Sequence, residues 1–68
     1  MKRGTVFEHR YWLDAKHMPL LCRVTAVRSG VVYYDEWDRD DPQPARGRWY
    51  FVQQHARRYV GKVLEEPA

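Results

Sequence analysis

LLCRVTAVRSGVVYYDEW, residues 20–37, is the stretch that decides the fold. Two runs rich in β-branched and aromatic residues flank Ser29-Gly30, and a glycine at this place supplies the positive φ angle that a tight hairpin turn needs. Two sets of side chains alternate along each run: Cys22, Val24 and Ala26 with Arg23, Thr25 and Val27 in the first, and Val31, Tyr33 and Asp35 with Val32, Tyr34 and Glu36 in the second. We therefore expect an antiparallel β-hairpin in the middle of the chain.

The segment before the hairpin predicts another strand. Residues 5–13 are rich in β-branched and aromatic side chains. Strict alternation would place Phe7, His9, Tyr11 and Leu13 on one face, and Val6, Glu8, Arg10 and Trp12 on the other. Polar residues and a proline follow at 14–19, DAKHMP, so we expect a loop between this strand and the hairpin.

The segment after the hairpin begins with an acidic loop. DEWDRDDPQPARG, residues 35–47, contains five acidic residues, two prolines and a glycine, and it predicts a long loop. RWYFV, residues 48–52, resumes as an aromatic strand. The tail fits both a helical stripe and a strand, but Gly61 disfavours one long helix. We expect a short helical turn over residues 53–58, a last strand over 59–64 and a frayed end at 65–68.

The size of the chain allows one small domain. It has 68 residues, and ten aromatic side chains supply burial that a short chain otherwise lacks. Cys22 is the only cysteine, which excludes an internal disulfide and indicates a reducing compartment, the cytoplasm. No apolar run reaches the length of a signal-peptide core or the roughly 20 residues that cross a bilayer, so we expect neither a targeting segment nor a membrane partner.

Charge is distributed unevenly along the chain. The net charge is +3, but five acids and one arginine give residues 35–41 a charge of −4, so the other 61 residues carry +7. A basic body with one acidic loop suits a phosphate-bearing partner. The acidic loop can then compete with nucleic acid for the basic face, or dock a basic partner.

The order of these elements resembles the Src-homology-3-like or Tudor-like small β-barrel over residues 4–64. The segments that carry the resemblance are RVTAVRSGVVYY (23–34), GRWYFV (47–52) and QQHARRYVGKVL (53–64). It implies a mostly all-β fold: a five-stranded antiparallel barrel with one short helical turn before the last strand. Barrels of this form also occur in short proteins of bacteria, phages and plasmids. The resemblance implies no single function, because this barrel hosts many tasks. Proline-rich peptide binding is not expected, since the ALYDY-like first strand and the proline downstream of Trp49-Tyr50 are missing.

Arginine and aromatic residues interleave at several places, which is typical of nucleic-acid binding. Cations neutralise phosphates, and flat rings provide surfaces on which bases stack. We expect a non-catalytic binding module whose candidate site residues are Arg10, Trp12, Arg23, Arg46, Arg48, Trp49, Tyr50, Arg57 and Arg58. The simpler alternative is that the rings form the core and the arginines a solvated rim.

A second functional alternative is a protein-interaction adaptor or inhibitor. Arginine, tryptophan and tyrosine are also typical hot-spot residues of protein interfaces. The exposed rings that would dock a partner protein are Trp12, Tyr34, Trp37, Trp49 and Tyr50. The open edges of an incompletely closed barrel also allow two copies to pair as a homodimer.

Catalysis and metal binding find little support in the sequence. No nucleophile elbow, phosphate-cradling loop or histidine-carboxylate motif occurs, so we expect no catalytic residue, no enzyme activity and no cofactor. The spacings of His9, His17, Cys22 and His55 match no compact zinc-ligand pair. The acidic loop lacks the glycine and terminal glutamate of a helix-flanked calcium loop. We therefore expect no metal site.

Overall fold

The protein is a five-stranded antiparallel sheet with one short helix, as the sequence predicts. The computed structural model describes the backbone of residues 1–40 and 45–68, and the side chains of residues 1–40 and 49–68. The elements in chain order are β1 (Val6–Leu13), β2 (Pro19–Arg28), β3 (Val31–Trp37), β4 (Ala45–Val52), the 3-10 helix η1 (Gln53–Arg58) and β5 (Val60–Glu65).

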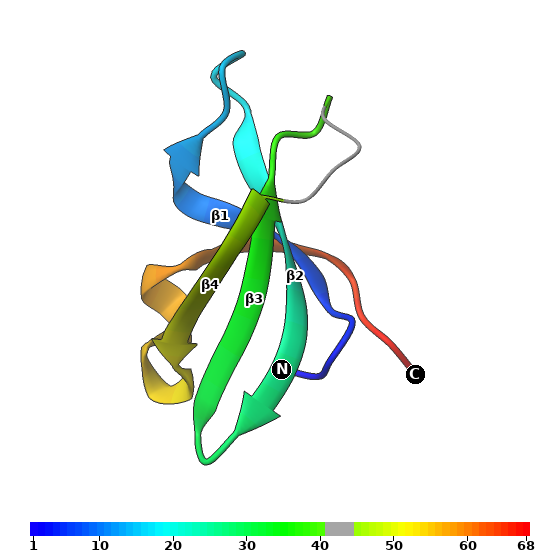
Figure 1. Cartoon of the computed structure of the whole chain (residues 1–68), viewed down its shortest axis with the longest axis vertical. Coiled ribbons are helices and arrows are strands. Elements are labelled where there is room, and N and C mark those ends of the chain that lie inside the picture. Colours follow the sequence, from blue (N-terminus) through cyan, green and yellow to red (C-terminus); the bar gives the residue numbers. More distant parts are fainter. Residues whose placement is uncertain (41–44) are drawn as a thin grey trace.

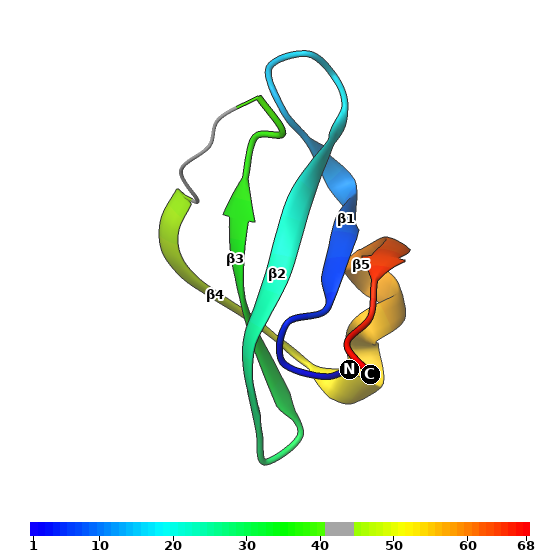
Figure 2. The same cartoon turned by 90° about the vertical axis from the view of Figure 1, so that its right-hand side faces the viewer.

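The sheet curls into an open, barrel-like form. Its strand order is β4-β3-β2-β1-β5, so β4 and β5 are its two outermost strands and the sheet does not close. Figure 1 shows β4, β3 and β2 side by side with β5 crossing behind them, and Figure 2 shows β1 and β5 turned away from β3 and β4. Helix η1 lies in the chain between the two outermost strands, at the open side of the sheet.

The central hairpin forms as predicted. Ser29 and Gly30 both have positive φ angles, 50° and 74°, which matches the right-handed twist of the strands that they connect. The predicted alternation holds through Cys22 and Val24, which are buried, but not through Ala26. A β-bulge shifts the pairing, so that Val24 lies opposite Tyr34 and Ala26 lies opposite Tyr33. The extra residue in β2 therefore ends the alternation.

The core fills the concave side of the sheet. Its buried apolar residues come from the first four strands: Phe7, Cys22, Val24, Val32, Tyr34 and Phe51. The ring centroids of Phe51 and Tyr59 lie 5.1 Å apart and the rings are stacked, so Tyr59, which follows η1, covers the open side of this cluster. Burying one phenylalanine side chain stabilises the folded state by about 1.5–3 kcal/mol, so these few rings supply most of the stabilisation of a small core.

Strand β1 departs from the predicted alternation. Phe7 and His9 are buried, but Tyr11 and Leu13, which strict alternation places on the same face, are 65% and 50% exposed. Pairing of β1 is irregular beyond Glu8, both toward β2 and toward β5. A strand that bends at such an irregularity no longer sends alternate side chains to the same face. The prediction that Tyr11 and Leu13 share a face with Phe7 and His9 was therefore wrong.

The acidic loop is shorter than predicted. Strand β3 continues through Trp37 and β4 begins at Ala45, so the strands take residues 35–37 and 45–47 from the segment assigned to the loop. Glu36 lies opposite Cys22 and is buried, because it shares the inward face with Val32 and Tyr34. Residues 41–44 of the predicted loop lie outside the described residues. At the other end, Glu65 pairs with Val6 and belongs to β5.

Helical content is small in the described part of the chain. The six-residue η1 is the one helix there, and it is far shorter than the roughly 20 residues that a membrane-spanning helix needs.

Candidate functional site

Two tryptophans meet across the open side of the sheet. The rings of Trp12 and Trp49 contact each other edge to face, with centroids 5.5 Å apart and an interplanar angle of 88°. Strands β1 and β4 are separated by two strands in the sheet, so the contact spans the curl and does not run between neighbours. Trp12 is 49% exposed and Trp49 is 38% exposed. These rings therefore belong partly to the fold and partly to the surface.

His9 fixes the position of Trp12. The two rings are stacked, with centroids 5.2 Å apart and an interplanar angle of 20°. The Nδ1 atom of His9 accepts hydrogen bonds from the backbone N–H groups of Tyr11 and Trp12, at 3.1 and 3.0 Å. His9 itself is buried, so the irregular end of β1 is hydrogen-bonded to a buried imidazole ring. The same bonds turn Tyr11 out to the solvent.

Arg10 connects this segment to η1. Its Nη1 atom donates a hydrogen bond of 2.5 Å to the carbonyl oxygen of Arg57, and its backbone N–H donates to the carbonyl of Tyr59 at 2.8 Å. The guanidinium also lies 5.5 Å from the centroid of the Tyr11 ring, a cation–π distance. A cation beside the last carbonyls of a helix is favourable because those carbonyls have no partner within the helix.

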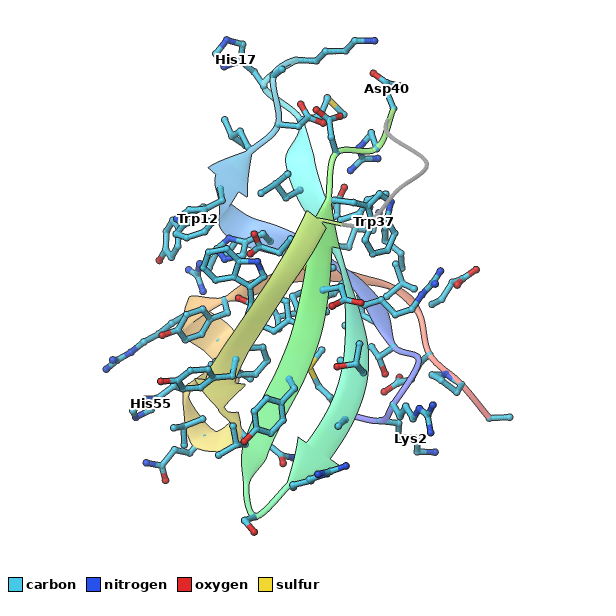
Figure 3. All side chains as sticks on the ribbon, in the orientation of Figure 1. Lys2, Trp12, His17, Trp37, Asp40 and His55 are labelled. Carbon is cyan, nitrogen blue, oxygen red and sulfur yellow. The ribbon has the colours of Figure 1, made fainter. Side chains whose placement is uncertain are left out.

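Further basic side chains accompany Arg10. Arg57 and Arg58 are exposed in the last turn of η1. Figure 3 places Trp12 and His55, a residue of η1, on one side of the molecule, and Trp37 and Lys2 on the other. We define the seam surface as the residues at this junction of β1, β4 and η1: Arg10, Tyr11, Trp12, Trp49, Arg57 and Arg58.

Two of the remaining residues predicted for the site, Arg23 and Tyr50, lie elsewhere. Arg23 is exposed on the outer face of β2, with its guanidinium 5.3 Å from the centroid of the Trp37 ring. Tyr50 is 64% exposed and pairs with Tyr33 on the outer face of β3 and β4. The side chains of Arg46 and Arg48 lie outside the described residues.

One of the rings proposed for protein docking cannot act at the surface. Tyr34 is buried in the core, where it packs against Phe7 and Phe51. Its alternation with Tyr33 places it on the inward face of β3. Tyr34 is therefore not available to a partner.

A buried pair of titratable groups lies behind the seam surface. His9 and Glu36 are about 5% exposed, and the His9 Nε2 and Glu36 Oε1 atoms are 3.9 Å apart. Burial lowers the pKa of His9 and raises the pKa of Glu36, and the Tyr34 hydroxyl opposes part of that rise. Because Nδ1 of His9 accepts two N–H groups, the proton of the neutral ring resides on Nε2, which faces Glu36. Glu36 Oε1 has no hydrogen-bond partner in the described part of the chain.

The sequence contained a signal for this pair. The predicted alternation already grouped Glu36 with Val32 and Tyr34, and the three residues share the inward face of β3. The acidic composition of residues 35–47 also assigned Glu36 to the predicted loop, so its burial was not expected.

The described start of the acidic loop contacts the β1–β2 end of the sheet. Arg39 donates to the Glu8 carboxylate at 2.7 Å and to the Pro19 carbonyl at 3.2 Å, and Lys16 forms an ion pair with Asp40. The β1–β2 turn is organised by Asp14, whose Oδ1 accepts the backbone N–H groups of Met18 and Lys16. These bonds hold the pKa of Asp14 below its ordinary value.

Groups that could coordinate a metal do not gather in the part of the chain whose side chains are described. No three histidine, cysteine or carboxylate side chains lie close enough there to hold an ion. Cys22 is fully buried, and burial raises the pKa of its thiol.

Comparison with known proteins found no matching family model, no similar curated protein and no similar solved structure.

Proposed function

We propose that this protein is a small non-catalytic nucleic-acid-binding module that binds through the seam surface, an inference that rests on the chemistry of that surface alone. The observation that carries the proposal is the grouping of Arg10, Tyr11 and Trp12. These three consecutive residues are all exposed, although strand alternation alone would have separated them onto two faces. Guanidinium groups beside solvent-exposed rings are the combination that phosphates and bases require.

The charges around the seam surface support this proposal. Two carboxylates near the loops are already paired, Glu8 with Arg39 and Asp40 with Lys16. Glu36 is buried behind the rings. None of the ion pairs among the described side chains involves Arg10, Arg57 or Arg58. These cations therefore keep their attraction for an anionic partner, and that attraction weakens with salt.

The finer classification of the fold is part of the same proposal. We infer a Src-homology-3-like or Tudor-like barrel from the strand order and from the helical turn between β4 and β5. The classification adds no function by itself, because small barrels of this kind serve many tasks.

The test is a titration of intrinsic tryptophan fluorescence with mixed-sequence DNA and RNA at roughly 50 and 200 mM salt. If Arg10, Arg57 and Arg58 each neutralise one phosphate, the salt slope for a single strand is about −2, and this fourfold rise in salt weakens binding about 20-fold. A Trp37→Phe variant removes a fluorophore outside the seam surface and leaves Trp12 and Trp49 as reporters. Absence of quenching at the lower salt would refute the proposal.

A second candidate function is protein binding through the outer face of β3 and β4. The Tyr33 and Tyr50 rings lie 6.2 Å apart there and are 37% and 64% exposed, and Val52 is 41% exposed. A shallow hollow of about 360 Å³ is lined partly by Thr25, Tyr33 and Asp35. Exposed aromatic rings beside a hollow suit a protein partner.

This second candidate includes a second copy of the chain. Sedimentation velocity over a wide concentration range tests self-association, and a Tyr50→Ala variant should weaken any dimer that uses this face. Monomer at every concentration would remove the homodimer. Binding of a partner protein would change little with salt, in contrast to binding of nucleic acid.

A further inference from the structure

We propose that the ligand of the seam surface is single-stranded nucleic acid, bound by base stacking on Tyr11 and Trp12 with its phosphates beside Arg10 and the arginines of η1. This inference rests on the proposed function and narrows it to one class of ligand. It also assigns the stacking surface to the irregular end of β1, and not to the outer tyrosines.

The geometry of Trp12 supports the first stacking position. One face of its indole ring is stacked on the buried His9, yet 49% of the residue is exposed. The exposed area must therefore lie on the parts of the ring that His9 and Trp49 leave uncovered. An exposed aromatic surface of this kind accepts any base, because every base has a π-face.

Tyr11 supplies the second position. It is 65% exposed, the largest value among the exposed large hydrophobic residues of the described part of the chain. The Arg10 guanidinium lies at a cation–π distance from its ring and is itself held by the Arg57 carbonyl. A base that stacks here gains contact with the ring, and its phosphate lies within the field of a guanidinium that is already positioned.

The surface is organised before the ligand arrives. Trp12 is held by its stacking on His9 and by the edge-to-face contact with Trp49, and the backbone of residues 11 and 12 is hydrogen-bonded to His9. Rings and backbone that are already ordered lose little conformational entropy on binding. This favours stacking even for a short strand.

A duplex fits these features poorly. Its bases stack on each other, so their faces are closed to Tyr11 and Trp12. The helical element of the described chain is the six-residue η1, which is too short to act as a recognition helix in a major groove. Phosphates of a duplex could still contact the arginines, so weak and purely electrostatic binding is expected for it.

The experiment compares four labelled 12-nucleotide probes by fluorescence anisotropy: single-stranded DNA, single-stranded RNA and the corresponding 12-bp duplexes, all at about 50 mM salt. We expect the single strands to bind at least tenfold more tightly than the duplexes. The DNA and RNA probes show which of the two strands is preferred. Circular dichroism verifies that every variant is folded.

Two matched variants locate the site. Tyr11→Leu removes an exposed ring of the seam surface, and Tyr50→Leu removes an equally exposed ring on the outer face of β4. Loss of one base–aromatic stack corresponds to roughly 5- to 150-fold weaker binding, which we expect for Tyr11→Leu only. Equal losses in the two variants would overturn the assignment of the site.

The failures of this inference and of the proposed function are distinguishable. Duplexes that bind as tightly as single strands would overturn the single-strand inference and leave nucleic-acid binding in place. Absence of binding by all four probes would overturn both. Tight binding of single strands by the wild-type protein, lost in Tyr11→Leu and kept in Tyr50→Leu, supports both.

Discussion

Replacing His9 by phenylalanine tests how the seam surface is built. The variant keeps an aromatic ring beside Trp12 but removes the Nδ1 acceptor for the backbone N–H groups of Tyr11 and Trp12. Each lost hydrogen bond costs about 0.5–1.5 kcal/mol, so we expect the free energy of unfolding to fall by about 1–3 kcal/mol. A domain of this size has a total stability of only about 3–10 kcal/mol, so the loss is readily measured.

The dependence on pH distinguishes the role of His9 from a general packing effect. Burial lowers the pKa of His9, so the unfolded chain takes up a proton near the ordinary value of 6.5 while the folded protein does not. This group therefore stabilises the fold above pH 6.5, and its contribution is lost as the pH falls through the lowered folded pKa. Glu36 has a raised pKa, so its effect is opposite: stability is greatest below the ordinary value of 4.5 and decreases as the pH rises through the folded pKa.

The assay is urea unfolding followed by tryptophan fluorescence and circular dichroism, at pH values between 4.5 and 7.5. In the wild type, the contributions of His9 and Glu36 oppose each other between pH 4.5 and 6.5. His9→Phe leaves only that of Glu36, so this variant should gain stability relative to the wild type as the pH falls. A His9→Asn control returns an acceptor near the Nδ1 position without the ring. A His9→Phe variant with wild-type stability and the same pH profile would refute the reasoning.

Three further predictions follow from the structure. Glu36→Gln should raise the free energy of unfolding near neutral pH by roughly 1–3 kcal/mol, because it removes the negative charge of a buried carboxylate, and burial disfavours the charged form. Urea titration at pH 7 measures this, and a loss of stability would contradict it. Replacing both Arg57 and Arg58 by glutamine should reduce the slope of log affinity against log salt by about 1.4. Replacing both Arg23 and Arg28 by glutamine removes the same charge outside the seam surface and should leave the slope nearly unchanged. Gly30→Ala should lower the free energy of unfolding by about 1–2 kcal/mol and lower the melting temperature. Gly30 has a φ of 74° and no atom lies within 4 Å of the added Cβ, so the whole cost is backbone strain. An unchanged melting temperature would contradict this.

Much of the fold follows from local sequence. A glycine in a two-residue turn between alternating runs sufficed to predict the β2–β3 hairpin, because the positive φ angles of Ser29 and Gly30 are a local requirement. The helical turn over residues 53–58 was predicted within the bounds of η1. The tail also fitted a strand pattern, and the strand β5 begins only after Tyr59. Gly61, which disfavours one long helix, had indicated this change from helix to strand.

The candidate site followed from the sequence only in part. Composition selected arginine and aromatic residues. Five of the selected residues with described side chains lie at the seam surface: Arg10, Trp12, Trp49, Arg57 and Arg58. Arg23 and Tyr50 were selected for the same reason but lie on outer faces. Tyr11 was assigned to the same face as Phe7 and His9, which are buried, and is instead the most exposed of the large rings.

The sequence by itself determined the number of strands, their order along the chain, the tight turn and the presence of a helical turn before the last strand. Each of these depends on residues that are neighbours in the chain. The tertiary structure alone decided that β1 bends beyond Glu8, that Glu36 is buried against His9, and that Trp12 meets Trp49 across two intervening strands. The physical reason is that side-chain direction in a strand depends on its pairing with both neighbours. One irregularity in that pairing reverses the alternation from which a sequence pattern is interpreted.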